Sequence, residues 1–474
     1  MEMVNPFPFS FLFSSGHPTG LASFGEGLRN VLESKTSGSK RGRGRPAKIP
    51  LVNLLCAQTL RMMKRSGSVA ECHEAATGRK LAGSCISRRI RRVDYETLQQ
   101  INDVVLQPKA TPERHPEAYW KGWKPVGIDG TTFSLQNCGK ILEDFPKHSN
   151  KSKKKNAQSE TSRGGQYGFS KINACALVEL GTHAPLAAEI GLNREGELTL
   201  AYRLIGKILP GMLLLADSLY GCGAFLQPLH HHCRRVGAAF VIRVLPAQTT
   251  TTLRELGDGS RLVEVGIRSR KRPEDIVEVI VVREVTYTVA STDENGNPTQ
   301  STCRLWTNLL DPKHYPALEL ATLITHRWEH EIYYGEAKSM LRHEYLESQL
   351  PETAAVEIMA LLWASSLLAE ARAEVALTGS EPTETVRVSF SKTRQSVEKL
   401  LWLICAGRGI LTDTQTEEII AKEFNELRER TLKPRRSRRC PRKVRRKQTH
   451  WPKLIKRSES KSRPTITLAE QAKE

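Results

Sequence analysis

Three ionisable residues between Thr325 and Lys338 have a spacing suited to phosphate chemistry. On a helix that turns about 100° per residue, Arg327, Glu331 and Lys338 would lie within about 40° of one another. An acid held between two basic residues suits a site where a carboxylate binds a metal ion and cations meet a polyanion. The pattern also fits a solvated helix stabilised by ion pairs four residues apart.

Two further carboxylates occur where strands are expected. Asp129 lies in PVGIDGTTFSL, residues 125–135, which predicts a hairpin with Asp129-Gly130 at its crest. Asp217 follows the apolar run MLLLA, which is typical of a strand buried on both faces. Ligands bind beyond the ends of such strands, although a helix cap would explain Asp217 equally well. With Glu331, these carboxylates could hold two Mg²⁺ ions for an in-line phosphodiester displacement.

The composition favours a nucleic-acid partner. The chain has 474 residues, of which 39% are hydrophobic and 26% charged, and its formal net charge is +20. Such a basic surface binds polyphosphates by releasing their counterions. No run approaches the roughly 18 consecutive apolar residues of a membrane-spanning helix, so we expect a cytoplasmic protein without membrane association. The ten cysteines include no C-x-x-C pair, which predicts reduced thiols and no zinc site.

The N-terminal third contains two candidate DNA-binding segments. Arg43 and Arg45 lie in an Arg-Gly-Arg-Pro sequence that resembles the AT-hook, although a basic linker would look the same. From residue 49 to 107 the pattern is helical, and the third expected helix, which begins near Ser84, carries Arg88, Arg89, Arg91 and Arg92 within about one and a half turns. Short helices ending in a basic one predict a helix-turn-helix-like module, with a charged helical bundle as the alternative.

The second half alternates between strand and helix patterns. Residues 245–310 are rich in β-branched residues, contain the hairpin marker Asn295-Gly296, and carry a basic turn at 268–272 that is either a phosphate contact or a solvated turn. Residues 351–377 predict a long, mostly buried helix. The tail from residue 428 is dominated by basic residues, which predicts disorder until it meets nucleic acid.

Taken in order, these motifs resemble the DDE transposases of bacterial insertion sequences, of the insertion-sequence-four-type branch with a Tyr-Arg-Glu-Lys signature. Arg327, Glu331 and Lys338 match Y-x2-R-x3-E-x6-K at the correct spacings, and GIDGTTF and LADSLYG are similar to the first two acidic motifs. The resemblance covers roughly residues 49–375. Ile324 stands where the family has a tyrosine that touches the DNA backbone, which puts one phosphate contact in doubt.

The resemblance implies an α/β fold with a ribonuclease-H-like mixed sheet flanked by helices, a β-rich insertion domain and an N-terminal helical DNA-binding module. Asp129, Asp217 and Glu331 would be the catalytic residues and would bind two Mg²⁺ ions, for which Mn²⁺ can substitute. Arg327 and Lys338 would hold DNA phosphates near the cut. The resemblance also implies a homodimer on DNA in which each subunit cuts the end bound by its partner.

The function expected is that of a DNA transposase, which binds the terminal inverted repeats of its element, cleaves the strand ends and joins the freed 3′-hydroxyls to target DNA. The alternatives are a non-catalytic DNA-binding protein derived from a transposase and a stand-alone metal-dependent nuclease of the same fold. The expected segments are a disordered basic arm (1–48), the helical module (49–107), the catalytic core (118–244 and 311–376), the β-rich insertion (245–310), a C-terminal helical region (377–427) and a disordered basic tail (428–474).

Overall fold

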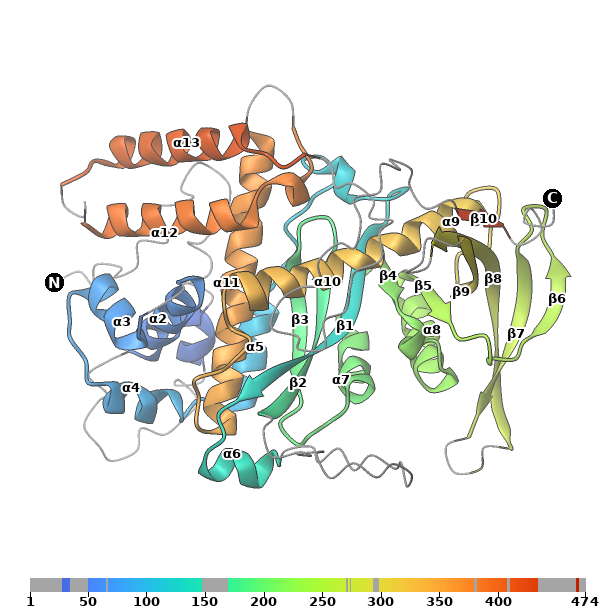
Figure 1. The fold of residues 1–474 in the computed structure, drawn as a ribbon, viewed down its shortest axis with the longest axis horizontal. Coiled ribbons are helices and arrows are strands. Elements are labelled where there is room, and N and C mark those ends of the chain that lie inside the picture. Colours follow the sequence, from blue (N-terminus) through green and yellow to red (C-terminus); the bar gives the residue numbers. More distant parts are fainter. Residues whose placement is uncertain are drawn as a thin grey trace. The chain divides into compact units, whose positions relative to one another are not determined.

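The computed structural model forms two compact units (Figure 1). It describes residues 28–34, 50–64, 67–146, 169–269, 272, 274–292, 298–378, 382–406, 410–433 and 466–468. The described parts of 1–119, 129–204 and 330–431 make up the first unit, and those of 120–128, 205–329 and 432–474 make up the second. One strand and one helix therefore pass from one unit into the other.

The strands of the first unit carry Asp129. They follow the order β3-β2-β1 and are β1 (Lys124–Leu135), β2 (Ser170–Glu179) and β3 (Ala184–Ile190), of which β2 and β3 are antiparallel. The prediction of a hairpin with Asp129-Gly130 at its crest is wrong, because β1 is one continuous strand of 12 residues. Asp129 thus lies in the middle of a strand, where aspartate is disfavoured by propensity.

Helices supply most of the core of the first unit (Figure 1). They are α2 (Leu51–Met63), α3 (Val69–Thr77), α4 (Gly83–Ile90), α5 (Tyr95–Val105), α6 (Gly139–Asp144), α7 (Glu197–Leu204), α11 (Pro351–Leu377), α12 (Phe390–Ala406) and α13 (Asp413–Glu429). The third helix expected near Ser84 is two helices, because Asp94 caps the start of α5 by accepting from the Thr97 amide at 2.7 Å. α7 packs against β2 and β3, and α5 and α11 pack against β3.

The predicted long helix at 351–377 is confirmed as α11, the central helix of the first unit. Its apolar side chains share one core with those of α2, α5 and α12. Its buried acids are paired, Glu357 with Arg61 at 3.4 Å and Glu370 with Lys109 at 2.9 Å. By length and composition it is the one described helix that could cross a membrane, but its apolar window is 100% buried, as in the core helix of a soluble protein.

The second unit continues from the first half of β1. Its strands follow the order β1-β4-β5-β9-β8-β7-β6, with β10 beside β8. They are β4 (Met212–Ala216), β5 (Ala239–Val244), β6 (Thr251–Glu255), β7 (Arg261–Arg268), β8 (Ile276–Thr292), β9 (Pro298–Thr307) and β10 (Ile466–Leu468). β1, β4 and β5 are parallel, and the remaining pairs are antiparallel.

The β-rich segment extends this sheet. β9 pairs with β5, and β8 pairs with β9 in register from Arg283↔Thr307 to Thr292↔Pro298. Antiparallel strands therefore flank Asn295-Gly296, and the predicted turn itself lies outside the described residues. Helix α8 (Gly223–Val236) packs on β5 and β7. Helix α9 (Ala317–Leu323) packs on β8 and β10. The predicted mixed sheet flanked by helices is confirmed.

Trp363 tests how strongly the first unit depends on α11. The side chain is fully buried, and its indole Nε1 donates to Asn102 Oδ1 at 2.8 Å. Trp363→Ala should lower the free energy of unfolding by about 3–5 kcal/mol, because a cavity opens and Asn102 loses a donor. The measurement is urea unfolding followed by circular dichroism. The control is Trp402→Ala, because Trp402 is 47% exposed and its removal should cost less stability. Equal losses of unfolding free energy in the two variants would contradict the prediction.

Candidate active site

Asp129 is held where β1 approaches the start of α7. The Gly130 amide donates both to Asp129 Oδ1 at 2.9 Å and to Glu197 Oε1 at 3.1 Å, so the two carboxylates share one donor. A Cβ atom added at Gly130 would overlap the Glu197 carboxyl group. A Cβ atom at this position would force either the Glu197 side chain or the strand to shift, and the strand runs straight through a dipeptide that usually forms a turn.

The stretch from Ile324 to Met340 is helical, as predicted, but it is not one α-helix. A 3₁₀ turn (Ile324–Arg327) leads into α10 (Trp328–Tyr334), and a π-helical turn (Gly335–Met340) follows. The His343 amide donates to the Lys338 carbonyl at 2.8 Å, five residues back, as expected of π-helical winding. The prediction of a single α-helical face from Arg327 to Lys338 is therefore wrong, because the winding changes on both sides of α10.

Two side chains of this helix bind β1 directly. The Tyr334 hydroxyl donates to the backbone carbonyl of Asp129 at 2.7 Å. Lys338 Nζ donates to Thr131 Oγ1 at 3.0 Å and to the Thr132 carbonyl at 2.6 Å, and it lies 5.1 Å from the ring centre of Phe133. Burial lowers the pKa of Lys338 and raises that of Tyr334. The predicted phosphate contact Lys338 is thus also a structural link to the strand of Asp129.

A buried charged cluster stabilises the π-helical turn. Glu336 Oε2 lies 2.7 Å from His183 Nδ1 and 3.1 Å from Arg372 Nη1. Arg372 also donates to the carbonyls of Val386 and Val388, at 3.2 and 3.0 Å. Glu336, His183 and Arg372 are all buried. Since removal of one partner from such a pair leaves a buried charge uncompensated, the cluster holds the turn in place.

Asp217 belongs to the second unit and directly follows the buried strand β4, as predicted. Its Oδ1 accepts from the Ser218 amide at 2.6 Å. Two guanidinium groups approach its carboxylate, Arg243 Nη1 at 3.7 Å from Oδ1 and Arg327 Nη2 at 3.7 Å from Oδ2. Ile324, at the signature tyrosine position, is buried and packs as a core residue.

The predicted residues are divided between the two units. Asp129 and Glu331 lie in the first and Asp217 in the second, with Asp129 partly exposed and Glu331 exposed. Among the described residues, no group of three or more His, Cys, Asp or Glu side chains is placed to hold a metal ion. The assignment of the three carboxylates to one metal site stays a prediction.

The predicted DNA contacts have different surroundings. Arg88 is exposed on α4, and Arg89 is partly buried. The side chain of Arg327 is 11% exposed, and its Nη2 lies 3.7 Å from Asp217 Oδ2. Arg43 and Arg45 lie outside the described residues.

Sequence reasoning missed three residues around these acids, namely Glu197, Tyr334 and Arg243. The sequence could have indicated Arg243, because it is the one charged residue in the apolar strand AFVIRV and such a residue needs a partner. Glu197 and Tyr334 gave none, since an acid at a helix start and a tyrosine on a helix have ordinary structural explanations.

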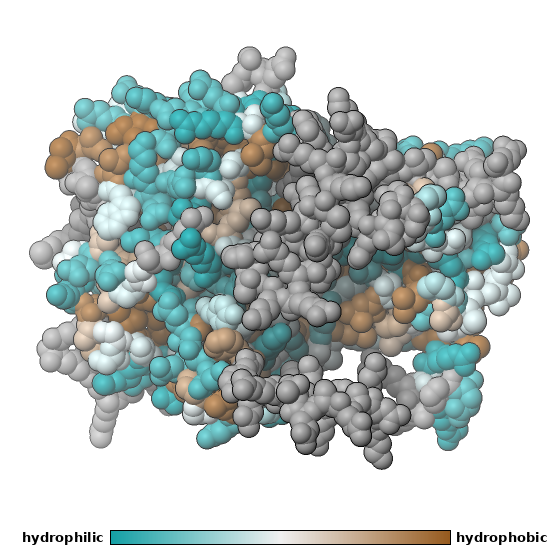
Figure 2. Space-filling model, in the orientation of Figure 1, coloured by the Kyte–Doolittle hydropathy of each residue, from teal (hydrophilic) through white to brown (hydrophobic). Residues whose placement is uncertain are grey.

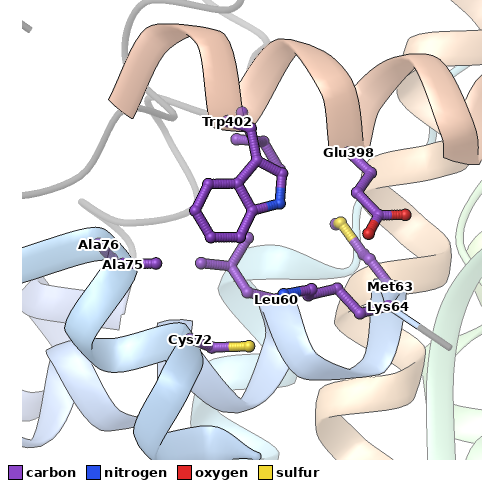
Figure 3. Close-up of a pocket in the computed structure, with 9 residues that line it drawn as sticks. Leu60, Met63, Lys64, Cys72, Ala75, Ala76, Glu398 and Trp402 are labelled. Atoms are coloured by element: carbon purple, nitrogen blue, oxygen red, sulfur yellow. The ribbon is translucent and has the colours of Figure 1, made fainter. Parts of the chain in front are cut away.

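An apolar pocket in the first unit is lined by none of these residues. Figure 3 shows Trp402 of α12 pointing toward Leu60 and Cys72 of α2 and α3, with Lys64 and Glu398 at the side. Lys64 Nζ lies 4.8 Å from the centre of the Trp402 ring. Figure 2 shows hydrophobic surface over the end of α12 and α13, beside hydrophilic surface along α13. The lining offers no pair of carboxylates for metal chemistry.

Comparison with known proteins identifies the family. The family model described as "Transposase DDE domain" matches residues 126–367. Transposase InsG for insertion sequence element IS4 of Escherichia coli (strain K12) is 25% identical over 386 residues, which cover 79% of this chain and 77% of InsG. A cryo-EM structure of the piggyBac transposase synaptic complex with hairpin DNA aligns with a TM-score of 0.39 and 9% identity, over 88% of this chain and 84% of that chain. The chain belongs to the DDE transposase family, of the IS4 type.

Proposed function

We propose that this chain is a transposase that binds the terminal inverted repeats of an insertion sequence, cleaves the strand ends and joins the freed 3′-hydroxyls to target DNA. The observation that carries the proposal is that the family match at 126–367 contains Asp129, Asp217 and Glu331 together. Its core would be ribonuclease-H-like, with residues 49–107 as a DNA-binding module. It would act in the cytoplasm as a homodimer on DNA.

The oxygen donors of the three carboxylates are of the chemical type that divalent metal ions prefer. Mg²⁺ and Mn²⁺ prefer oxygen ligands, and all three side chains are at least partly exposed and so can be reached from solvent. When bound, two such ions would activate water or a 3′-hydroxyl and stabilise the leaving oxygen of the phosphodiester. The chain's own contribution is to hold Asp129 and Glu331 on neighbouring elements of one unit and to place two arginines beside Asp217.

The basic side chains would bind the DNA backbone. Arg327 and Arg243 place positive charge beside Asp217, where a phosphate can approach. Lys338 uses two N–H groups to bind β1, which leaves the third for a phosphate oxygen. Arg88 and Arg89 on α4 would contact the backbone of the terminal repeat, as would Arg43 and Arg45 in the minor groove.

Replacement of any one of the three acids by its amide should abolish cleavage. Asp129→Asn, Asp217→Asn and Glu331→Gln keep side-chain size but remove the charge that binds Mg²⁺, so cleavage of an end-containing duplex should fall at least about 100-fold. Glu329→Gln is the control on the same helix and should retain activity. Undiminished cleavage by one of the three variants would remove that residue from the site, and cleavage without joining to a plasmid would indicate a nuclease.

Gly130→Ala should inactivate the enzyme without unfolding it. The new Cβ would overlap the Glu197 carboxyl group, so either Glu197 or the strand at Asp129 must shift. Shifts of about 1 Å can cost roughly 100-fold in rate. Cleavage rate and melting temperature are the measurements. The control is Gly139→Ala on α6, where a Cβ has open space. Full activity of Gly130→Ala would show that Asp129 does not depend on this contact.

Arg88→Gln should weaken the binding of terminal-repeat duplex in a salt-dependent way. If Arg88 contacts one phosphate, the slope of log K against log salt concentration should become shallower by about 0.9. Fluorescence anisotropy at several salt concentrations measures this. Lys313→Gln, at an exposed residue after β9 that belongs to none of the proposed contacts, provides a comparison of equal charge, and an unchanged slope for Arg88→Gln would remove α4 from the DNA interface.

A further inference from the structure

The helix that carries Glu331 is hydrogen-bonded to the backbone of Asp129. Tyr334 is three residues after Glu331 on α10, which places the two side chains about 60° apart on the same helix. Its hydroxyl donates to the Asp129 carbonyl at 2.7 Å, within the first unit. One hydrogen bond thus joins the strand of one predicted metal ligand to the helical turn of another.

The surroundings of Tyr334 favour a permanent donor. A tyrosine hydroxyl ordinarily keeps its proton at neutral pH, so it can donate to the Asp129 carbonyl throughout that range. The ring packs against two others of its helix, with centroids 4.9 Å from His330 and 5.4 Å from Tyr333. The aromatic packing fixes the ring, and the hydrogen bond fixes the distance to β1.

The hydrogen bonds from Lys338 to β1 do not substitute for the hydrogen bond from Tyr334. Lys338 binds Thr131 and Thr132, two and three residues beyond Asp129, and it extends from the π-helical turn rather than from α10. Its bonds therefore fix the register of the turn on β1. The bond from Tyr334 reaches the backbone of Asp129 directly, one helical turn from Glu331.

We propose that Tyr334 is a positioning residue that sets the separation of the Asp129 and Glu331 carboxylates and thereby the affinity of the active site for its divalent metal. This inference rests on the proposed function, since it takes both acids as metal ligands. A binding constellation must be held within about 0.5 Å to work, and a hydroxyl-to-carbonyl bond between the two supporting elements provides that constraint.

The test measures two quantities in the full chain: direct Mn²⁺ binding, followed by the electron paramagnetic resonance signal of the free ion, and the dependence of end cleavage on Mn²⁺ concentration. The dissociation constant of Mn²⁺ and the Mn²⁺ concentration for half-maximal cleavage should change together. Tyr334→Phe removes the hydroxyl and keeps the ring. The Mn²⁺ concentration for half-maximal rate should rise roughly three- to tenfold, the usual worth of one hydrogen bond, while the rate at saturating Mn²⁺ falls at most about twofold. The control is Tyr333→Phe, which removes a buried hydroxyl near Ser365 of α11 and should leave the Mn²⁺ dependence unchanged.

The outcomes separate this inference from the proposed function. Absence of Mn²⁺-dependent cleavage in the unmodified chain would overturn the proposed function and this inference with it. An active unmodified chain together with an unchanged half-saturating Mn²⁺ concentration in Tyr334→Phe would overturn this inference alone. Equal shifts in both tyrosine variants would also overturn it, because a general loosening of the helix would then explain the effect.

Discussion

The geometry of the first unit depends on the contact between a helix and the middle of β1. Strand and helix backbones satisfy their own hydrogen bonds, so the two elements need side chains to fix their distance. Tyr334 and Lys338 do this by donating to Asp129, Thr131 and Thr132. Both donors are partly buried, where hydrogen bonds are stronger than in water. The contact therefore gives Asp129 and Glu331 a common rigid support.

The π-helical turn is the second element of this support. A π turn has poorer geometry than an α turn, and it persists where side-chain interactions compensate for it. Here Glu336 enters the core and meets His183 and Arg372, and Arg372 also binds carbonyls of the chain after α11. A buried carboxylate is costly unless it is paired, so the turn is kept where both partners reach it. The same turn directs Lys338 toward β1.

The sequence correctly predicted those helices and strands that depend on the pattern of neighbouring residues. The apolar run before Asp217 indicates the buried strand β4, and the apolar content of 351–377 indicates α11. The prediction of a hairpin at Asp129-Gly130 was wrong because β1 continues through this dipeptide, where the Gly130 amide donates to Glu197, 67 residues along the chain. The change of winding after Tyr334 was equally out of reach, since Glu336 finds its partners 153 and 36 residues away. Residue types thus indicate the candidate acids, whereas distant partners decide their geometry.

The two aspartates have opposite electrostatic surroundings. Asp217 has Arg243 and Arg327 at 3.7 Å, so its negative charge is already partly balanced and the surplus of cations favours a polyanion nearby. Asp129 shares the Gly130 amide with Glu197, and two carboxylates on one donor repel each other unless a cation offsets their charge. Phosphodiester chemistry needs both conditions, a place for the DNA backbone and a place for positive ions. In the proposed transposase, the arginines beside Asp217 would meet the DNA backbone, and the two carboxylates at the Gly130 amide would favour the positive ions that Asp217 and Glu331 would also bind.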